Sequence, residues 1–191
     1  MLCIMYIYIT LILIIHLRTG KSWATERIVK RFNKDNKVIH VTAPTGIAAI
    51  NVGGMTVHSW GRFRLGEYYT DFDNMFSEET REKIRSTDCL LIDEISMLDG
   101  HLFDVLECMI TIIRCYTDEL YKQLNQITAG DKSIINETVL RMRWDTYSEN
   151  GLGDLPPFGG MQLCVVGDFY QLSHIANGVD EKMDNGKTTG S

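Results

Sequence analysis

The chain has 191 residues, enough for one domain with a hydrophobic core and few for two. Apolar residues make up 45% and charged residues 23% of it, as in ordinary globular proteins rather than disordered ones. The formal net charge of -6 lacks the overall basic character common in nucleic-acid-binding domains, although a basic groove can exist in an acidic protein.

Residues 1–17 form an apolar leader without Asp, Glu, Lys or Arg. The leader is slightly shorter than the roughly 20 residues that span a bilayer. It also lacks the basic segment and small-residue cleavage site of a signal peptide. Three interpretations stay open: a membrane anchor, a buried first strand rich in β-branched residues, or a truncated or wrongly assigned start.

Residues 18–22 include Thr19-Gly20-Lys21-Ser22 and precede a segment of helical composition, residues 23–32. Gly-Lys-Ser at the start of a helix is the second half of a phosphate-binding loop. In such loops the lysine reaches the β- and γ-phosphates, the hydroxyl binds Mg²⁺ and helix amides hold the anion. The complete pattern G-x-x-x-x-G-K-[ST] has a glycine where this chain has Ile15. The tripeptide alone is common, so a chance match stays open.

Residues 38–43 predict a strand, residues 44–52 a loop with a short helix, and residues 53–60 a turn. Pro44 stands where helices often begin. Polar and aromatic residues follow this strand, and four of them are candidates to face a nucleic-acid backbone and its bases: Thr45, His58, Ser59 and Trp60. A hydrogen-bonded loop position is the alternative for His58.

Residues 66–80 are acidic and aromatic and predict a surface loop; residues 78–86 predict a helix that leads into the next strand. Residues 90–92 are apolar, like a buried strand of a parallel sheet, and Asp93 and Glu94 follow directly. Ligands of open α/β sheets bind beyond the carboxyl ends of strands. There, one carboxylate can hold Mg²⁺ while its neighbour orients or deprotonates an attacking water. Two solvated acids are the alternative.

Asp99 is expected to cap the next helix. An apolar stripe at spacings of three and four indicates that this helix packs in the core: Leu102, Leu106, Met109, Ile110 and Ile113. Residues 116–157 then predict an insertion. Two amphipathic segments joined by a polar linker favour a helical hairpin there.

Residues 161–166 predict another buried strand, and Gln171 follows its carboxyl end, where it could sense a γ-phosphate. The polar tail, residues 176–191, predicts disorder. Five cysteines lack the Cys-x-x-Cys spacing of zinc sites and are interpreted as reduced thiols of an intracellular protein: Cys3, Cys89, Cys108, Cys115 and Cys164.

Together these segments resemble the Pif-type ATP-dependent DNA helicases, superfamily-one enzymes that move 5′ to 3′ on single-stranded DNA. The resemblance extends over about residues 18–175, with residues 116–157 as an insertion. Five segments match in order: residues 19–22, 42–49, 53–59, 91–99, and 157–163 running on to 167–172.

The resemblance implies an α/β fold: one three-layer RecA-like P-loop NTPase domain with a parallel sheet, the first of two such domains in the family. It implies ATP and Mg²⁺ as cofactors. It further implies single-stranded DNA and duplex junctions as partners, roles in DNA repair, recombination and telomere maintenance, and a place in the nucleus or mitochondrion. The residues it assigns to the nucleotide are Thr19, Gly20, Lys21, Ser22 and Asp93, with Ser22 and Asp93 on the metal, Glu94 activating water and Gln171 coupling the γ-phosphate to domain motion. It assigns Pro44, Thr45, His58 and Ser59 to the DNA path.

Two departures from the family pattern are visible: the incomplete phosphate loop, and Ser173-His174 where the family has a proline pair. The second motor domain is not encoded in these residues, so the chain alone is expected to bind ATP weakly, with negligible hydrolysis and no strand separation. One alternative function is a degenerate, non-catalytic domain that binds single strands or a partner. Another is a membrane-anchored P-loop NTPase of a different family.

Overall fold

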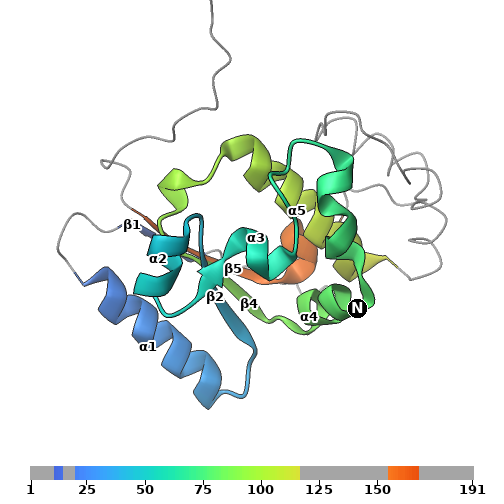
Figure 1. The fold of residues 1–191 in the computed structure, drawn as a ribbon. Coiled ribbons are helices and arrows are strands. Elements are labelled where there is room, and N and C mark those ends of the chain that lie inside the picture. Colours follow the sequence, from blue (N-terminus) through green and yellow to red (C-terminus); the bar gives the residue numbers. More distant parts are fainter. Residues whose placement is uncertain (1–10, 15–19, 117–154, 168–191) are drawn as a thin grey trace, which may run out of the picture.

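The structure is a computed structural model that describes residues 11–14, 20–116 and 155–167. Five strands form one parallel sheet in the order β1-β5-β4-β2-β3 (Figure 1). The strands are β1 (Leu11–Ile14), β2 (Ile39–Ala43), β3 (Met55–Thr56), β4 (Cys89–Ile92) and β5 (Gln162–Gly167). The predicted parallel sheet of an α/β domain is confirmed.

Helices cover both faces of the sheet, so the predicted three-layer arrangement is confirmed as well (Figure 1). On one face, Ile28 and Phe32 of α1 pack against the side chains of β4 and β5. On the other face, a larger cluster joins β4 and β5 to α3, α4, α5 and η1. The helices are α1 (Lys21–Lys34), α2 (Gly46–Asn51), α3 (Val57–Gly61), η1 (Tyr69–Phe76), α4 (Glu78–Ser86), η2 (Ile95–Met97), α5 (Gly100–Cys115) and η3 (Pro157–Gly160).

Residues 66–80, predicted as a surface loop, contribute to the core instead. Tyr69, Phe72 and Met75 are buried along η1. Their spacing matches the three residues per turn of a 3₁₀-helix, which places all three side chains on one side. The buried Asp71 carboxylate accepts hydrogen bonds from three backbone N–H groups of the preceding loop: Gly66, Glu67 and Tyr68. The loop prediction is wrong because acidic composition conceals this apolar period.

Residues 53–60, predicted as a turn, contain β3 and α3. Thr56 is the N-cap of α3, and its hydroxyl oxygen accepts a hydrogen bond from the Ser59 N–H at 3.1 Å. Trp60 is fully buried, with its ring centroid 6.2 Å from that of His40. The expectation that Trp60 faces nucleic acid is therefore wrong, because α3 turns this side chain into the core.

The helix predicted over residues 78–86 is confirmed as α4. The helix after Asp99 is confirmed as α5, and the Asp99 carboxylate accepts a hydrogen bond from the Leu102 N–H at 3.0 Å. All five residues of the predicted apolar stripe are buried: Leu102, Leu106, Met109, Ile110 and Ile113.

Two arginines tie together the ends of α4, α5 and η3, near the amino ends of β4 and β5. Arg114 of α5 donates hydrogen bonds to three carbonyl groups at the end of α4 and to one in η3, while Arg85 of α4 donates to two at the end of α5. Because carbonyl groups at helix ends lack donors within the helix, each arginine caps the other helix. The acceptors, 2.7–3.1 Å away, belong to Ile84, Arg85, Thr87, Ile113, Tyr116 and Gly159.

Two further side chains of α5 hold the backbone of η3. The Glu107 carboxylate accepts hydrogen bonds from the Phe158 N–H at 3.1 Å and the Thr111 hydroxyl at 2.8 Å. The Thr111 hydroxyl oxygen in turn accepts a hydrogen bond from the Gly159 N–H at 3.0 Å. We refer to Arg85, Glu107, Thr111 and Arg114 with their partners as the arginine network.

Part of the leader forms a strand, because Leu11–Ile14 is β1 and pairs in parallel with β5. In the described part of the chain, no helix is both long and apolar enough to cross a bilayer. Several predictions lie outside the described residues: the hairpin between residues 117 and 154, the tail from residue 176, and the roles of Thr19 and Gln171.

Candidate functional site

The segments that follow β2, β3 and β4 leave the sheet along its carboxyl edge. Thr42 of β2 is in register with Ile92 of β4 and Met55 of β3. The Asp93 N–H donates a hydrogen bond to the Thr42 carbonyl at 2.8 Å, which continues the pairing one residue beyond β4. Two groups of predicted site residues therefore lie along one edge: Asp93 and Glu94 beyond β4, and Pro44, Thr45, His58 and Ser59 beyond β2 and β3.

The start of α1 has the geometry of an anion site. Gly20 is the N-cap and has φ 83°, a left-handed conformation that glycine adopts without strain. Its carbonyl accepts the first helical hydrogen bond, from the Ala24 N–H at 2.9 Å. The N–H groups of the first turn have no acceptors within the helix, and they form the positive end of the helix dipole. Lys21 and Ser22 are the first two helical residues, so their amides belong to this turn.

Lys21 and Glu94, which are 73 residues apart in sequence, form an ion pair across this edge. Lys21 Nζ lies 2.9 Å from Glu94 Oε1, and the two side chains are 18% and 22% exposed. Glu94 has φ 52°, a left-handed conformation that is uncommon outside glycine and costs of order 1 kcal/mol. The two halves of the predicted nucleotide site, at α1 and β4, are thus in direct contact.

Gly167 at the end of β5 lets the Glu94 turn approach closely. A Cβ atom on Gly167 would lie 2.9 Å from Ile95 Cγ2 and 3.3 Å from the Ile95 backbone nitrogen. A larger residue would displace the turn that carries Glu94. The glycine therefore supports the position of the carboxylate rather than contributing chemistry of its own.

Asp93 is almost entirely buried, with 9% of its surface exposed. Burial raises the pKa of its carboxyl group above the ordinary value, and a hydrogen bond from the Glu94 backbone opposes this rise. The negative charge of Glu94 raises the same pKa further, and the positive charge of Lys21 lowers it. A carboxylate held charged under these conditions is costly unless a cation compensates it.

The polar atoms of this edge fit a hydrated Mg²⁺ ion and a phosphate chain. Three of the buried side-chain oxygens that lack a hydrogen-bond partner among the described residues lie at this edge: Asp93 Oδ1, Glu94 Oε2 and Ser96 Oγ. No three His, Cys, Asp or Glu side chains in the described ranges group tightly enough to hold a metal by themselves. Mg²⁺ typically takes only one or two carboxylates, with water and phosphate oxygens completing its shell. We refer to Lys21, Asp93, Glu94 and Ser96 as the carboxyl-edge site.

The predicted nucleic-acid residues lie further along the same edge, toward β3. Thr45 is the N-cap of α2, and its hydroxyl oxygen accepts a hydrogen bond from the Ala48 N–H at 3.3 Å. Pro44 therefore lies before the helix and not at its first position. Ser59 is exposed in the first turn of α3. His58 is half-buried against Phe63, with ring centroids 4.6 Å apart.

Burial lowers the pKa of His58, which favours the neutral form of its imidazole. A neutral imidazole can donate a hydrogen bond to a phosphate but adds no positive charge. This part of the edge therefore offers hydroxyl groups and one ring N–H, a set suited to contacts with a nucleic-acid backbone.

A family model of the PIF1-like helicases matches residues 13–186 of the chain. The chain belongs to this family. It is 35% identical over 163 residues to ATP-dependent DNA helicase PIF1 of Candida albicans. This match covers 82% of this chain and 14% of that protein. It is 30% identical over 163 residues to ATP-dependent DNA helicase RRM3 of Saccharomyces cerevisiae. This match covers 83% of this chain and 17% of that protein. The chain thus spans less than a fifth of these curated relatives.

Solved structures of PIF1-like helicases share the fold. The crystal structure of Pif1 helicase from Candida albicans matches with a TM-score of 0.61 and 30% identity, over 87% of this chain and 30% of that one. Bacteroides Pif1 bound to ssDNA matches with a TM-score of 0.53 and 28% identity, over 82% of this chain and 28% of that one. The predicted family and its α/β fold are confirmed.

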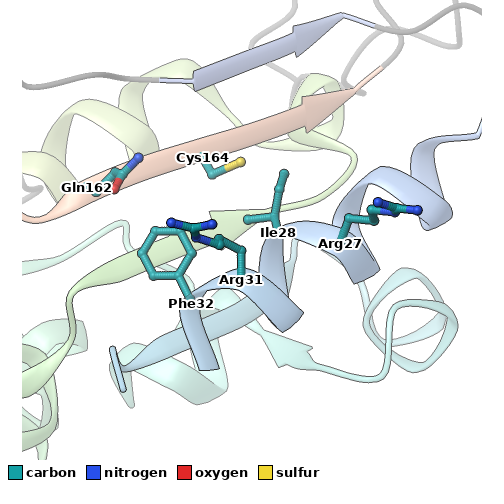
Figure 2. Close-up of a pocket in the computed structure, with 6 residues that line it drawn as sticks. All are labelled: Arg27, Ile28, Arg31, Phe32, Gln162 and Cys164. Atoms are coloured by element: carbon teal, nitrogen blue, oxygen red, sulfur yellow. The ribbon is translucent and has the colours of Figure 1, made fainter. Parts of the chain in front are cut away.

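A groove of about 240 Å³ lies between α1 and β5, away from the carboxyl-edge site of this PIF1-like domain. Figure 2 shows Arg31 and Phe32 on the same side as Gln162, with Arg27 at the other end. No predicted site residue lines this groove: its walls are Arg27, Ile28, Arg31, Phe32, Gln162 and Cys164.

Sequence reasoning assigned no role to Ser96, a member of the carboxyl-edge site whose buried hydroxyl group has no partner in the described part of the chain. The only local signal is its position two residues after Glu94. A serine in such a segment equally suits a turn, so its role depends on the tertiary placement of η2.

Proposed function

We propose that this chain forms the first RecA-like motor domain of an ATP-dependent DNA helicase that moves 5′ to 3′, with Mg·ATP bound at the carboxyl-edge site. The observation that supports this most is the Lys21–Glu94 ion pair beside the buried Asp93. It joins a lysine that can bind phosphate to two carboxylates at a strand end, the arrangement that phosphoryl transfer requires.

The residues of the site have different roles according to their positions. The first-turn amides of α1 and the Lys21 ammonium bind the phosphate chain, together with Thr19 and Gly20, which precede them in the sequence. The Ser22 hydroxyl and the Asp93 carboxylate hold Mg²⁺, which when bound neutralises charge on the phosphates. Glu94 orients the attacking water and accepts its proton, and Gln171 couples the γ-phosphate to domain motion.

The ion pair adds a consequence for the order of events. The Lys21 ammonium has three N–H donors, so a bound phosphate would share this group with Glu94 and weaken their 2.9 Å contact. A weakened contact would make Glu94 Oε1 available when a nucleotide is present. A carboxylate that is paired without nucleotide becomes available as a base once nucleotide binds.

Single-stranded DNA is assigned to the β2–β3 part of the edge. Pro44 and Thr45 follow β2, and His58 and Ser59 follow β3, so one strand could contact both. Bacteroides Pif1, 28% identical, has been solved in complex with ADP-AlF3 and ssDNA, and this supports the pairing of the two ligands. We extend the proposal to duplex junctions, to DNA repair, recombination and telomere maintenance, and to the nucleus or mitochondrion.

The test is calorimetric titration of the 191-residue chain with Mg·ATP. Lys21→Ala should lower the affinity about 10- to 100-fold, because it removes a charged hydrogen-bond donor to phosphate. Lys30→Ala is the matched control: Lys30 lies on the same helix, exposed and paired only locally with Glu26. Equal affinity of the Lys21→Ala and Lys30→Ala chains would contradict the proposal. Binding of single-stranded DNA without Mg·ATP binding would favour the non-catalytic alternative.

A further inference from the structure

Trp23 occupies a position that packing does not explain. It is the third residue of α1, directly after Ser22, and 60% of its surface is exposed. The side of α1 that faces the sheet carries Ile28 and Phe32 at a spacing of four residues. At 100° per residue, Trp23 lies well over 100° around the helix from this side. The indole is thus a large apolar group kept in solvent at the start of the phosphate-binding helix.

Arg27 holds the Trp23 ring from one face. The Arg27 guanidinium carbon lies 4.4 Å from the ring centroid, one helical turn further along α1. Figure 2 shows the Arg27 side chain extending away from Ile28 and Phe32. Such a contact is worth about 0.5–1 kcal/mol at an exposed position and restricts the ring's rotation. Because a guanidinium covers only one face of an indole, the exposed surface includes the other face.

The Trp23 ring covers the turn that would bind the phosphate chain. Side chains of a helix tilt toward its N-terminus, so the surface that Trp23 covers is the turn that holds Lys21 and Ser22. A triphosphate bound by that turn would carry its ribose and base within the same region. We propose that Trp23 stacks on the base of the bound nucleotide, with Arg27 supporting the opposite face of the indole.

This assignment rests on the proposed function, since it requires a nucleotide at Lys21. It adds a recognition element for a different part of the ligand: the phosphate chain is bound by charge, and the base by a flat aromatic surface. Every base has a face that can stack, so the contact should favour nucleotides over inorganic phosphates without strong selection among bases.

The test compares two ligands that share the phosphate chain, Mg·ATP and Mg·tripolyphosphate, by calorimetric titration. Trp23→Ala should weaken ATP binding about 5- to 100-fold and change tripolyphosphate binding by less than about twofold, because stacking acts on the base alone. Trp23→Phe should retain part of the ATP affinity. Tyr68→Ala is the control, since Tyr68 is also an exposed aromatic residue, at 42%, but belongs to the loop before η1.

Each outcome separates the two proposals. Unchanged ATP affinity of Trp23→Ala, with Lys21→Ala still defective, would overturn the stacking assignment and leave the proposed function standing. Equal loss of both ligands in Trp23→Ala would also overturn it, because the indole would then support the helix rather than the base. A chain that binds neither ligand would overturn the proposed function and the assignment of Trp23 with it.

Discussion

The arginine network near the amino end of β4 and the carboxyl-edge site at its other end both gather charged side chains, yet they differ in how these are bonded. In the network, Arg114 donates to four carbonyl groups and Arg85 to two. In the carboxyl-edge site, Asp93, Glu94 and Ser96 each leave a buried oxygen without a partner among the described residues. Saturated hydrogen bonding is typical of a structural role, and unsatisfied polar atoms of a binding site.

The backbone shows the same difference in a second way. Glu94 is held in a left-handed conformation with only one ion pair to position its side chain. Phe158 in η3 has φ 53°, but its N–H is bonded to Glu107 and its neighbour Gly159 is bonded to Thr111 and Arg114. Strain in η3 is thus compensated by local hydrogen bonds. At Glu94 the local hydrogen bonds run from its own N–H to the Asp93 carboxyl group and from the Met97 N–H to its carbonyl, so this strained turn sets the position of both acidic residues.

The largest expected effect on stability comes from removing a side chain of the arginine network. Arg114→Ala should destabilise the domain by about 3–5 kcal/mol, because several part-buried carbonyl groups lose their donor at once. Arg31→Ala is the control, since Arg31 is exposed and pairs locally with Asp35; it should cost less than about 0.5 kcal/mol. Thermal unfolding followed by circular dichroism measures both. A loss below about 1 kcal/mol for Arg114→Ala would show that the network is not the main support of this end.

The next effect comes from Asp93→Asn, which should act oppositely on stability and binding. Mg²⁺-dependent ATP affinity should fall about tenfold or more, because a charged metal ligand becomes neutral. Stability at pH 7 should rise, because burial of the charged carboxylate is unfavourable. Each kcal/mol of added stability should raise the Tm by about 2–4 °C.

The pH dependence fixes the sign of the Asp93 effect. The folded-state pKa of Asp93 is raised, so the folded chain binds the proton more tightly than the unfolded chain does. Stability is therefore lost as pH rises from the unfolded-state pKa, about 3.9, through the raised folded-state value. The Tm advantage of Asp93→Asn should be present at pH 7 and disappear below about pH 4. An advantage that does not change with pH would show that the charge of Asp93 is not its cause.

A smaller effect tests the competition for Lys21. Glu94→Gln should raise ATP affinity about 3- to 10-fold, because the lysine no longer has to leave an ion pair of about 1 kcal/mol. In a chain supplied with a complete phosphate loop and a second motor domain, hydrolysis followed as phosphate release should also fall, because an amide cannot accept the proton. Glu67→Gln, on an exposed loop residue, is the control. Weaker ATP binding by Glu94→Gln would mean that Glu94 positions Lys21 for the nucleotide instead of competing with it.

Local patterns in the sequence were sufficient for β2, β4 and β5 and for helices α4 and α5, whereas β1 was one of three open interpretations and β3 lay in a predicted turn. The apolar run before Asp93 and the stripe after Asp99 both depend on nearest neighbours and periodicity, which a single sequence contains. The core role of η1 was missed because its period of three is short and its composition acidic. Trp60 was misassigned because its burial depends on how α3 packs against β2, as its contact with His40 shows.

The candidate site was predictable in its parts but not in its contacts. Lys21 and the pair Asp93-Glu94 stand in recognisable motifs, so their residue types and the chemistry expected of them are local information. The 2.9 Å ion pair between Lys21 and Glu94 joins positions 73 residues apart and exists only because α1 and β4 share the same edge. The burial that shifts the pKa of Asp93 is likewise a property of the folded sheet.

The smallest expected effect concerns the segment between α5 and η3. Tyr116 and Leu155, which border it, both pack against the main core cluster. The arginine network holds the adjoining backbone on each side, through the carbonyl groups of Tyr116 and Gly159. Both borders of this segment are therefore anchored to the core by residues outside it. Replacing residues 118–150 with a short Gly/Ser linker should leave unfolding cooperative and change ATP affinity by less than about twofold. Loss of a cooperative thermal transition would show that this segment belongs to the core.

Combining the linker with Arg114→Ala should cost about as much stability as Arg114→Ala alone, since the network acts on the borders and not through the segment.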